Sequence, residues 1–282
     1  MNAIELRGLR KTYGSPAAKR HAAVDGIDLT VRQGEIFALL GPNGAGKTTT
    51  IEILEGHRGR DDGEVSVLGA DPASAGRAWR ARIGIVAQQA TDAAELSVLE
   101  LVRHFAGYYP NPRDPETVID LVGLTDKAGA RVRTLSGGQR RRVDVALGII
   151  GTPELVFLDE PTTGFDPEAR RQFWELIRSL AADGTTILLT THYLDEAEAL
   201  ADRVAVLTGG RIVAQDTPSG LGGRATAEAA VHWVDANGPH EVHTKTPTSV
   251  IAQLAVGGEL PELRVTRPSL EDVYLNLIGE DR

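Results

Sequence analysis

The stretch that decides the fold is Gly41-Pro42-Asn43-Gly44-Ala45-Gly46-Lys47-Thr48. Its glycines let backbone N–H groups turn inward around a polyphosphate without Cβ clashes, and a helix that follows it presents a positive N-terminal end to the same anion. Lys47 would reach the β and γ phosphates, and Thr48 would place its hydroxyl on Mg²⁺. The stretch therefore predicts a loop that holds a nucleotide polyphosphate.

The sequence around this loop predicts an α/β fold. An apolar run, 35–40, enters the loop and a helical pattern, 49–55, leaves it. Short apolar runs recur later and alternate with helical patterns, which is typical of a parallel sheet covered on both faces. Two runs ahead of the loop predict an antiparallel sheet. The later runs are 155–158, 186–189 and 204–207, and the two earlier ones are 4–9 and 27–31.

A helical segment is predicted between these strands, at about 98–150. The sequence Asn-Pro-Arg-Asp-Pro at 111–115 breaks it into pieces, and residues 135–139 open its last helix. The segment thus reads as a helical subdomain inserted into the nucleotide-binding domain.

The composition changes after about residue 222 toward Ala, Thr and Gly. Apolar runs resume there and a final helix closes the chain, so we expect a nucleotide-binding domain over 1–222 and a small accessory α/β module over 223–282. The runs lie at 229–234 and 263–265, and the helix at 269–278.

Length, charge and cysteine content limit the classes of function. The chain has 282 residues with 41% hydrophobic content, which is enough for packed cores. Its net charge of -9 opposes attraction to nucleic acid, so no nucleic-acid partner is expected. It has no cysteine, which excludes disulfides and thiolate metal sites. We find no signal segment, and the longest stretch without charged residues, 246–258, is too short to span a bilayer as a helix. A cytoplasmic location is expected, with any membrane role supplied by a partner.

Two adjacent carboxylates, Asp159 and Glu160, end the apolar run at 155–158. Side chains of consecutive extended residues point in different directions, so one carboxylate can serve a metal while the other serves water. Asp159 suits the Mg²⁺ shell, and Glu160 is then placed to orient or deprotonate the water that attacks the γ phosphate. His192 follows the next strand and should emerge at the same sheet edge, where it could donate to the γ phosphate or hold Glu160 in register. A lone histidine at a strand end is otherwise more often a surface or cap residue.

Two further side chains have weaker signals. Gln88 follows a predicted strand at 83–86, where its amide could bind Mg²⁺ or the attacking water, but Gln89 beside it has the same chemistry. Tyr13 precedes a Gly-Ser-Pro turn, and its ring could stack on adenine. An ordinary edge-strand aromatic explains Tyr13 equally well.

A second anion site is predicted at Ser136-Gly137-Gly138-Gln139. Ser136 suits a helix N-cap, and the two glycines allow close backbone approach. One γ phosphate cannot easily receive two helix N-termini from one small domain, so this segment is expected to reach the ATP of another copy. For Arg140, Arg141 and Arg142, which follow, a solvated helix face is favoured over a nucleic-acid patch.

Together these motifs resemble those of the ATP-binding subunit of ABC transporters, and the resemblance covers 4–220. Residues 41–48 match the Walker A loop, 135–139 the signature, 155–160 Walker B and 163–166 the D-loop. The resemblance implies a P-loop NTPase core of the ABC ATPase type, with a parallel sheet, an antiparallel β subdomain and a helical subdomain. It implies nucleotide contacts at Tyr13, Gly41, Pro42, Asn43, Gly44, Ala45, Gly46, Lys47, Thr48, Thr49, Ser136, Gly137, Gly138, Gln139 and Asp166, Mg²⁺ contacts at Thr48, Gln88 and Asp159, and catalytic roles for Glu160, His192 and Gln88.

The resemblance also implies partners. A head-to-tail homodimer would hold two ATP molecules, each between the Walker A loop of one copy and the signature of the other, and a separate transmembrane permease would dock near Gln88 and the helical segment. The chain would then lie at the inner face of the cell membrane. The tail at 267–274, Arg-Pro-Ser-Leu-Glu-Asp-Val-Tyr, is similar to that of daunorubicin-resistance-type exporters and favours export of a hydrophobic, drug-like substrate. An importer ATPase and a soluble ATPase of the same superfamily are the alternatives.

Two positions depart from the pattern of the family. Ala87 stands where a proline often precedes the Q-loop glutamine, and Phe165 stands where leucine is common in the D-loop. Neither departure removes a catalytic group.

Overall fold

A six-stranded sheet forms the centre of the computed structural model, which describes residues 1–14, 21–86, 95–235 and 237–279. The strand order is β5-β6-β7-β3-β8-β9, and all neighbours are parallel except β8 and β9. The predicted parallel sheet is confirmed, and the antiparallel edge strand β9 is an addition to it. The strands are β3 (Ile36–Leu40), β5 (Ile83–Val86), β6 (Leu155–Asp159), β7 (Thr186–Thr191), β8 (Arg203–Thr208) and β9 (Arg211–Asp216).

A second sheet, antiparallel and three-stranded, has the order β2-β1-β4. Its apolar residues share a core with one face of the central sheet, where Phe37 and Phe157 are fully buried. The predicted pairing of the two earliest strands is therefore confirmed. The strands are β1 (Asn2–Tyr13), β2 (His21–Arg32) and β4 (Asp62–Val67).

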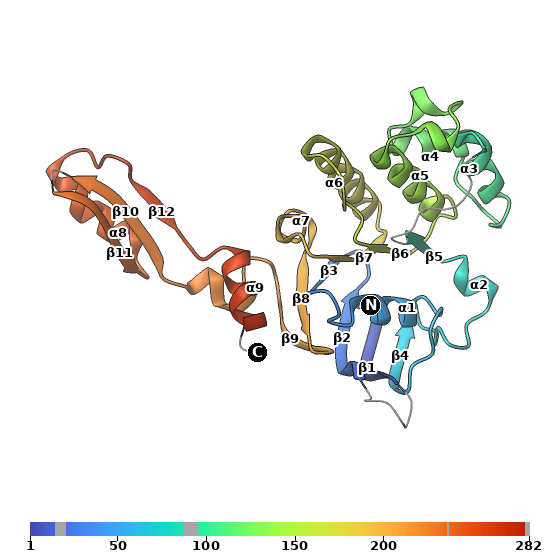
Figure 1. Cartoon of the computed structure of the whole chain (residues 1–282), viewed down its shortest axis with the longest axis horizontal. Helices are drawn as coiled ribbons and strands as arrows, with labels where there is room; N and C mark the ends of the chain where they lie inside the picture. The colour runs from blue at the N-terminus through green and yellow to red at the C-terminus, as the bar shows by residue number, and fades with distance from the viewer. Residues whose placement is uncertain (15–20, 87–94, 236, 280–282) are drawn as a thin grey trace.

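The helices of the predicted helical segment lie together at the side of the molecule away from the antiparallel sheet (Figure 1). They are α3 (Val98–Ala106), α4 (Pro115–Leu121) and α5 (Gly137–Ile149), joined by η1 (Thr125–Lys127) and η2 (Val132–Thr134). Asp114 caps α4 by accepting from the Thr117 N–H, and Pro115 occupies its first turn, so the Pro-rich break at 111–115 starts a helix.

Three of the remaining helices of the nucleotide-binding domain pack on the central sheet, and the fourth lies beside the antiparallel sheet, where Trp79 Nε1 donates to the Val67 carbonyl at 2.8 Å. The loop at 41–46 leads directly into α1, and α7 follows β7 after a short turn. The bounds are α1 (Lys47–Leu54), α2 (Arg77–Arg80), α6 (Pro167–Ala182) and α7 (Leu194–Leu200). Among the described residues, no helix is long and apolar enough to cross a membrane.

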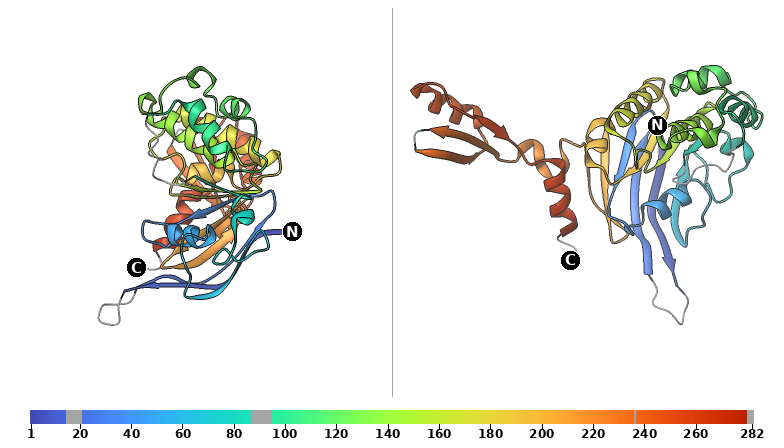
Figure 2. Two further views of the ribbon diagram at one scale, coloured as in Figure 1. Left: turned by 90° about the vertical axis from the view of Figure 1, so that its right-hand side faces the viewer. Right: turned by 45° about the horizontal axis from the view of Figure 1, so that its top comes forward.

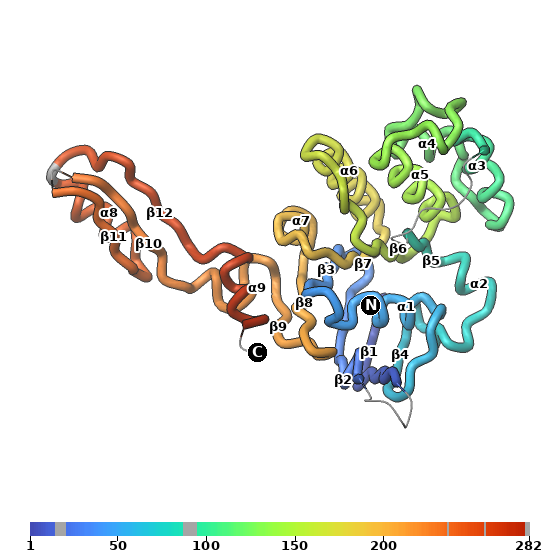
Figure 3. The backbone as a smooth tube through the Cα atoms, viewed as in Figure 1, coloured from blue at the N-terminus to red at the C-terminus, as the bar shows by residue number. Residues whose placement is uncertain are grey.

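A small sheet of order β11-β10-β12 extends away from the rest of the molecule (Figures 1 and 2). The chain leaves through η3, builds this sheet and returns as α9 beside the nucleotide-binding domain, a path that Figure 3 traces. Leu221, Leu270, Val273 and Tyr274 belong to the same buried core as the central sheet. The elements are η3 (Leu221–Thr226), β10 (Ala229–Asp235), β11 (Gly238–Thr244), α8 (Pro247–Leu254), η4 (Ala255–Gly257), β12 (Arg264–Thr266) and α9 (Leu270–Gly279).

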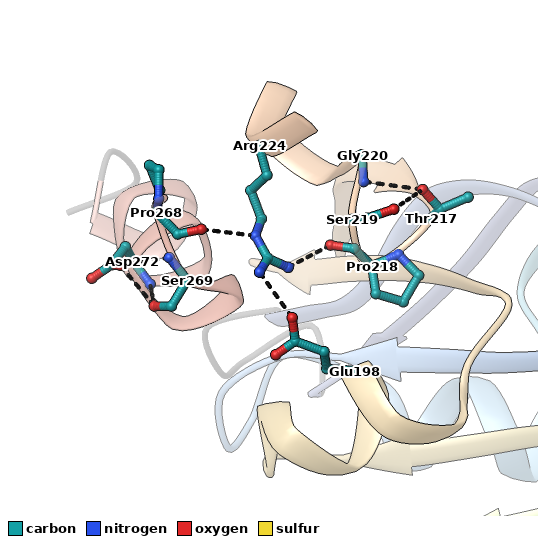
Figure 4. Close-up of polar contacts among 9 residues, drawn as sticks. All are labelled: Glu198, Thr217, Pro218, Ser219, Gly220, Arg224, Pro268, Ser269 and Asp272. Carbon is teal, nitrogen blue, oxygen red and sulfur yellow. Dashed lines mark hydrogen bonds and ion pairs between the residues drawn. The ribbon is translucent and has the colours of Figure 1, made fainter. Parts of the chain in front are cut away.

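Arg224 ties the returning segment to α7 (Figure 4). Its Nε donates to the Pro268 carbonyl at 3.0 Å, one Nη to the Pro218 carbonyl at 2.7 Å, and the other to Glu198 Oε1 at 2.8 Å. One guanidinium thus fixes α9, η3 and α7 relative to one another. The expected division at residue 222 stays a prediction, and residues on both sides of it share a core.

Candidate nucleotide site

The loop between β3 and α1 is held closely against neighbouring backbone. Gly44 and Gly46 have φ values of +80° and +107°, a region that favours glycine. A Cβ on Gly41 would lie 2.3 Å from the Leu207 carbonyl oxygen, and one on Gly46 would lie 2.1 Å from that of Ala23. All three glycines of the motif are therefore required by the fold of the loop, before any ligand is considered.

Lys47 connects this loop to the carboxylates of the next strand. Its side chain is buried, and Nζ donates to the carbonyls of Gly41 at 2.7 Å and Pro42 at 3.2 Å. Burial lowers the pKa of Lys47, and the charges of Glu160 and Asp159 act in the opposite direction. The ammonium group is therefore close enough to both carboxylates to interact with them.

The N-terminus of α1 has the donors that an anion requires. Gly46 precedes the helix and supplies no side-chain cap, so the N–H groups of the first turn are not used by a cap. Thr48 is exposed in this first turn, whereas Thr50 turns back to donate to the Gly46 carbonyl at 2.9 Å. A hydroxyl, an ammonium group and free N–H groups are the donor set that suits a phosphate chain with Mg²⁺.

Tyr13, at the end of β1, lies beside the start of α1. Its hydroxyl is 3.4 Å from Thr49 Oγ1, and the Arg58 guanidinium carbon lies 5.3 Å from its ring centre. Tyr13 therefore borders the loop, and adenine stacking by its ring stays a prediction. The sequence reasoning missed Arg58.

The carboxylates at the end of β6 are fixed by Thr190 on β7. Thr190 Oγ1 donates to Asp159 Oδ1, and the Glu160 N–H lies 3.1 Å from both the carbonyl and the hydroxyl oxygen of Thr190. Glu160 has a φ of +45°, a left-handed conformation that a side chain adopts at a cost of roughly 1 to 3 kcal/mol. Strain of this kind at a strand end is typical of functional sites.

His192 lies opposite Glu160 at the same sheet edge. Its Nδ1 is 3.5 Å from Glu160 Oε1, and its ring centre is 4.1 Å from that of Tyr193. The Glu160 side chain is 14% exposed and that of His192 is 40% exposed, so the pair opens to the surface on the histidine side. The expected proximity is confirmed, while the catalytic roles stay predictions.

Ser136 caps α5 as expected. Gln139 N–H donates to Ser136 Oγ at 3.2 Å, and Ser136 N–H donates to Gln139 Oε1 at 3.0 Å. A Cβ on Gly137 would meet nothing within 4 Å, and one on Gly138 would have no contact closer than 3.9 Å. The start of α5 therefore presents an open backbone surface to another molecule.

Arg141 corrects the expectation of a solvated arginine face. Arg140 is exposed, but Arg141 is buried and donates to the carbonyls of Pro161 at 3.1 Å and Asp159 at 2.8 Å. Burial lowers its pKa, and the charge of Asp144, the next largest effect, raises it. Arg141 thus joins the signature helix to the end of β6.

Asp166 and Phe165 begin α6. The Asp166 side chain accepts from the Ala169 N–H at 2.8 Å as the helix N-cap, and Phe165 packs edge-on against Phe173 at 5.8 Å between ring centres. Phe165 therefore fills core space, and a nucleotide contact from Asp166 stays a prediction. Gln88 and Ala87 lie outside the described residues.

Comparison with known proteins decides the family. The model of the ABC transporter family matches residues 24–163. A daunorubicin resistance ATP-binding protein, DrrA2 of Streptomyces coeruleorubidus, is 39% identical over 98% of this chain and 95% of its own length. The chain belongs to the ABC transporter family. It is an ATPase of that family and binds ATP.

Further relatives of this ABC ATPase cover almost the whole chain. A Nod factor export ATP-binding protein I of Rhizobium johnstonii is 38% identical over 99% of this chain and 96% of its own length. Two solved structures share the fold at 24% identity. An ATP-binding subunit of an ABC transporter has a TM-score of 0.71 over 98% of this chain and 99% of its own, and a dimeric ATP-binding cassette bound to ADP and Pi has a TM-score of 0.69 over 76% and 98%.

Proposed function

We propose that this ABC ATPase hydrolyses ATP at the loop 41–48 and that Glu160 acts on the attacking water, in a complex that exports a hydrophobic, drug-like molecule. The observation that carries the proposal is the Glu160–His192 pair, 3.5 Å apart, beside a buried Lys47 that interacts with both Glu160 and Asp159. Phosphate-binding groups and a candidate general base thus lie close together at one edge of the central sheet.

Each residue of this site has a distinct task. The N–H groups at the start of α1 and the ammonium group of Lys47 bind phosphate oxygens, because both present positive charge to the same anion. Thr48 and Asp159 supply the hydroxyl and carboxylate oxygens that would hold Mg²⁺, which neutralises the charge that develops on the phosphates. Glu160 accepts the proton of water, and His192 holds that carboxylate in place.

A second copy of the chain would complete the site. The start of α5 is open at Gly137 and Gly138, and Ser136 offers a hydroxyl and a helix N-terminus at the same point. A related cassette is described as a dimer bound to ADP and Pi. The expected head-to-tail homodimer is the arrangement that brings this open end to the ATP of the other copy.

Export through a separate permease is favoured by the relatives. The relatives reported above are named for daunorubicin resistance and for Nod factor export. The described residues contain no helix that could cross a membrane. The permease would dock near the helical segment and hold the chain at the inner face of the membrane. Transport assays in vesicles that contain the purified permease test the direction of transport, and ATP-driven import would contradict the proposal.

Replacement of Glu160 tests the proposed reaction. Glu160→Gln keeps the size of the side chain and removes its basicity, so steady-state turnover should fall on the order of 10² to 10⁴-fold while ATP still binds. Glu154→Gln is the matched control, because Glu154 lies at the opposite end of β6, paired with Arg82 at 2.6 Å. Near-normal turnover in Glu160→Gln refutes the assignment.

A further inference from the structure

A group of buried polar atoms lies between α6, α7 and the chain that follows β6. In the described part of the chain, five buried side-chain nitrogen and oxygen atoms lack a partner in full hydrogen-bonding geometry. Four of them lie on Thr162, Trp174 and Glu196, and the fifth is Arg170 Nε, one turn from Trp174 on α6. Proteins bury few such atoms, so their concentration in one place calls for a reason.

Glu196 is the centre of this group. It lies in the first turn of α7, and no part of it is exposed. Burial is the largest effect on the pKa of its carboxyl group and raises it, whereas the hydroxyls of Thr191 and Thr162 and the indole N–H of Trp174 lower it. The charge of Asp195 adds to the rise. Donors from three separate parts of the chain therefore face one carboxyl group.

The first of these donors shapes the turn that carries His192. Thr191 is the last residue of β7, and its Oγ1 accepts from the Tyr193 N–H at 2.9 Å. The hydroxyl thus closes the chain around His192, and it is also one of the groups that lower the pKa of the Glu196 carboxyl group. The carboxyl group of Glu196 is therefore placed to hold this turn through the Thr191 side chain.

The second donor belongs to the chain that carries Glu160. Thr162 follows Glu160 by two residues, is fully buried, and accepts at its carbonyl from the Phe165 N–H at 3.0 Å. It therefore fixes the turn between β6 and α6. Glu196 faces this turn and the His192 turn at once, although it contributes no atom to the nucleotide site itself.

We propose that Glu196 is a positioning residue for ATP hydrolysis, whose carboxyl group sets the separation of Glu160 and His192 by joining Thr162 to Thr191. This inference rests on the proposed roles of Glu160 and His192. The two side chains are 3.5 Å apart, so a small displacement of either turn takes them out of contact. Misplacement of catalytic groups by about 1 Å can cost on the order of 10²-fold in rate.

Two substitutions of Glu196 separate positioning from folding. Glu196→Leu preserves the volume and removes the polar atoms, whereas Glu196→Gln keeps a polar group at both oxygen positions. We expect Glu196→Leu to lower kcat by about tenfold or more with KM for ATP changed by less than about threefold, because the phosphate loop is untouched. Glu196→Gln should stay within about threefold of the unaltered protein in both constants.

Glu198→Gln is the matched control on the same helix. Glu198 is half exposed and pairs with Arg224 at 2.8 Å, so its replacement removes an ion pair of α7 that involves no member of the buried group. Its kcat should change by less than about twofold. Melting temperatures and the affinity for a non-hydrolysable ATP analogue are measured for every variant.

The outcomes are distinguishable. Normal kcat in Glu196→Leu, or an equal loss in Glu196→Gln, overturns the positioning role. If Glu196→Leu does not fold, Thr162→Val takes its place, because the Thr162 hydroxyl has no other hydrogen-bond partner among the described residues. We expect a loss of about fivefold or more in kcat, and a normal kcat there overturns the inference. Glu160→Gln is assayed in parallel. Retained turnover in that variant overturns the site itself, whereas its loss together with a normal Glu196→Leu overturns only the inference.

Discussion

The contribution of Glu55 to the free energy of unfolding falls as pH rises. It caps the C-terminal end of α1, is 7% exposed, and lines a cavity of about 400 Å³ together with His57 and Asp144. Burial, followed by the charges of Asp159 and Glu52, raises the pKa of Glu55 from 4.5 to about 8. The folded protein therefore keeps a proton that the unfolded chain releases at neutral pH.

The sign and size follow from this difference. Below pH 4.5 the carboxyl group is neutral in both states and costs nothing, and between pH 4.5 and about 8 the unfolded state gains progressively from ionisation. A shift of about 3.5 units at ~1.4 kcal/mol per unit sets an upper limit of roughly 5 kcal/mol. Because Glu55 keeps 7% of its surface exposed, solvent screens part of this effect, and we expect ~2 to 4 kcal/mol between pH 5 and pH 8.

Glu55→Gln removes the titration and keeps the shape. Urea denaturation should give nearly equal free energies of unfolding for Glu55→Gln and the unaltered protein at pH 5, and a more stable variant at pH 8. Glu154→Gln is the opposite control, since Arg82 lowers the pKa of Glu154 and its loss costs stability only at higher pH. A difference between Glu55→Gln and the unaltered protein that is the same at both pH values refutes the reasoning.

Three further substitutions test the site. Lys47→Ala should weaken ATP binding measured by calorimetry, because a charge-assisted phosphate contact is lost, and an unchanged affinity counts against its role. Ser136→Arg should leave binding intact and prevent the ATP-dependent dimer seen by light scattering, and an unaltered dimer population argues the other way. Arg141→Met should lower the free energy of unfolding by about 2 to 4 kcal/mol, because the carbonyls of Asp159 and Pro161 lose a buried donor. The control Arg140→Met, at an exposed position, should change it by less than about 0.5 kcal/mol. Equal effects of the two substitutions would exclude the buried role of Arg141.

The central sheet could be predicted because its strands are buried on both faces. Continuous apolar runs such as those of β6 and β7 are typical of strands in a parallel sheet with both faces covered. The loop at 41–48 fixes which strand precedes α1. The approach of His192 to Glu160 followed from the same topology, since parallel neighbours end at one edge. Strand β9 was missed because most of its residues are exposed and its apolar run, 212–214, is short.

Arg141 and Glu196 were missed for a different reason. Charged residues are rarely buried, so neither residue type signals an interior position. The helical period contained a clue for Arg141, because Val145, Gly148 and Ile149 lie at i+4, i+7 and i+8 on the same buried face of α5. Glu196 is buried only because α6 and the turns beside His192 and Glu160 meet there, which is a property of the tertiary fold.

The C-terminal region shows how far a change in composition can be used. The change near residue 222 indicated a separate module, and the sheet of β10, β11 and β12 does stand apart from the rest. The helix at its end packs on the nucleotide-binding domain instead, through Leu270, Val273 and Tyr274. Its apolar residues are visible in the sequence, but the surface they bury against is not.

The dependence of turnover on protein concentration tests most directly whether two copies share each ATP site. We expect the rate per molecule to rise with concentration and level off once dimers predominate, and the rise to disappear in Ser136→Arg. A rate per molecule that stays constant down to extreme dilution would contradict a site built from Lys47 of one copy and Ser136 of another.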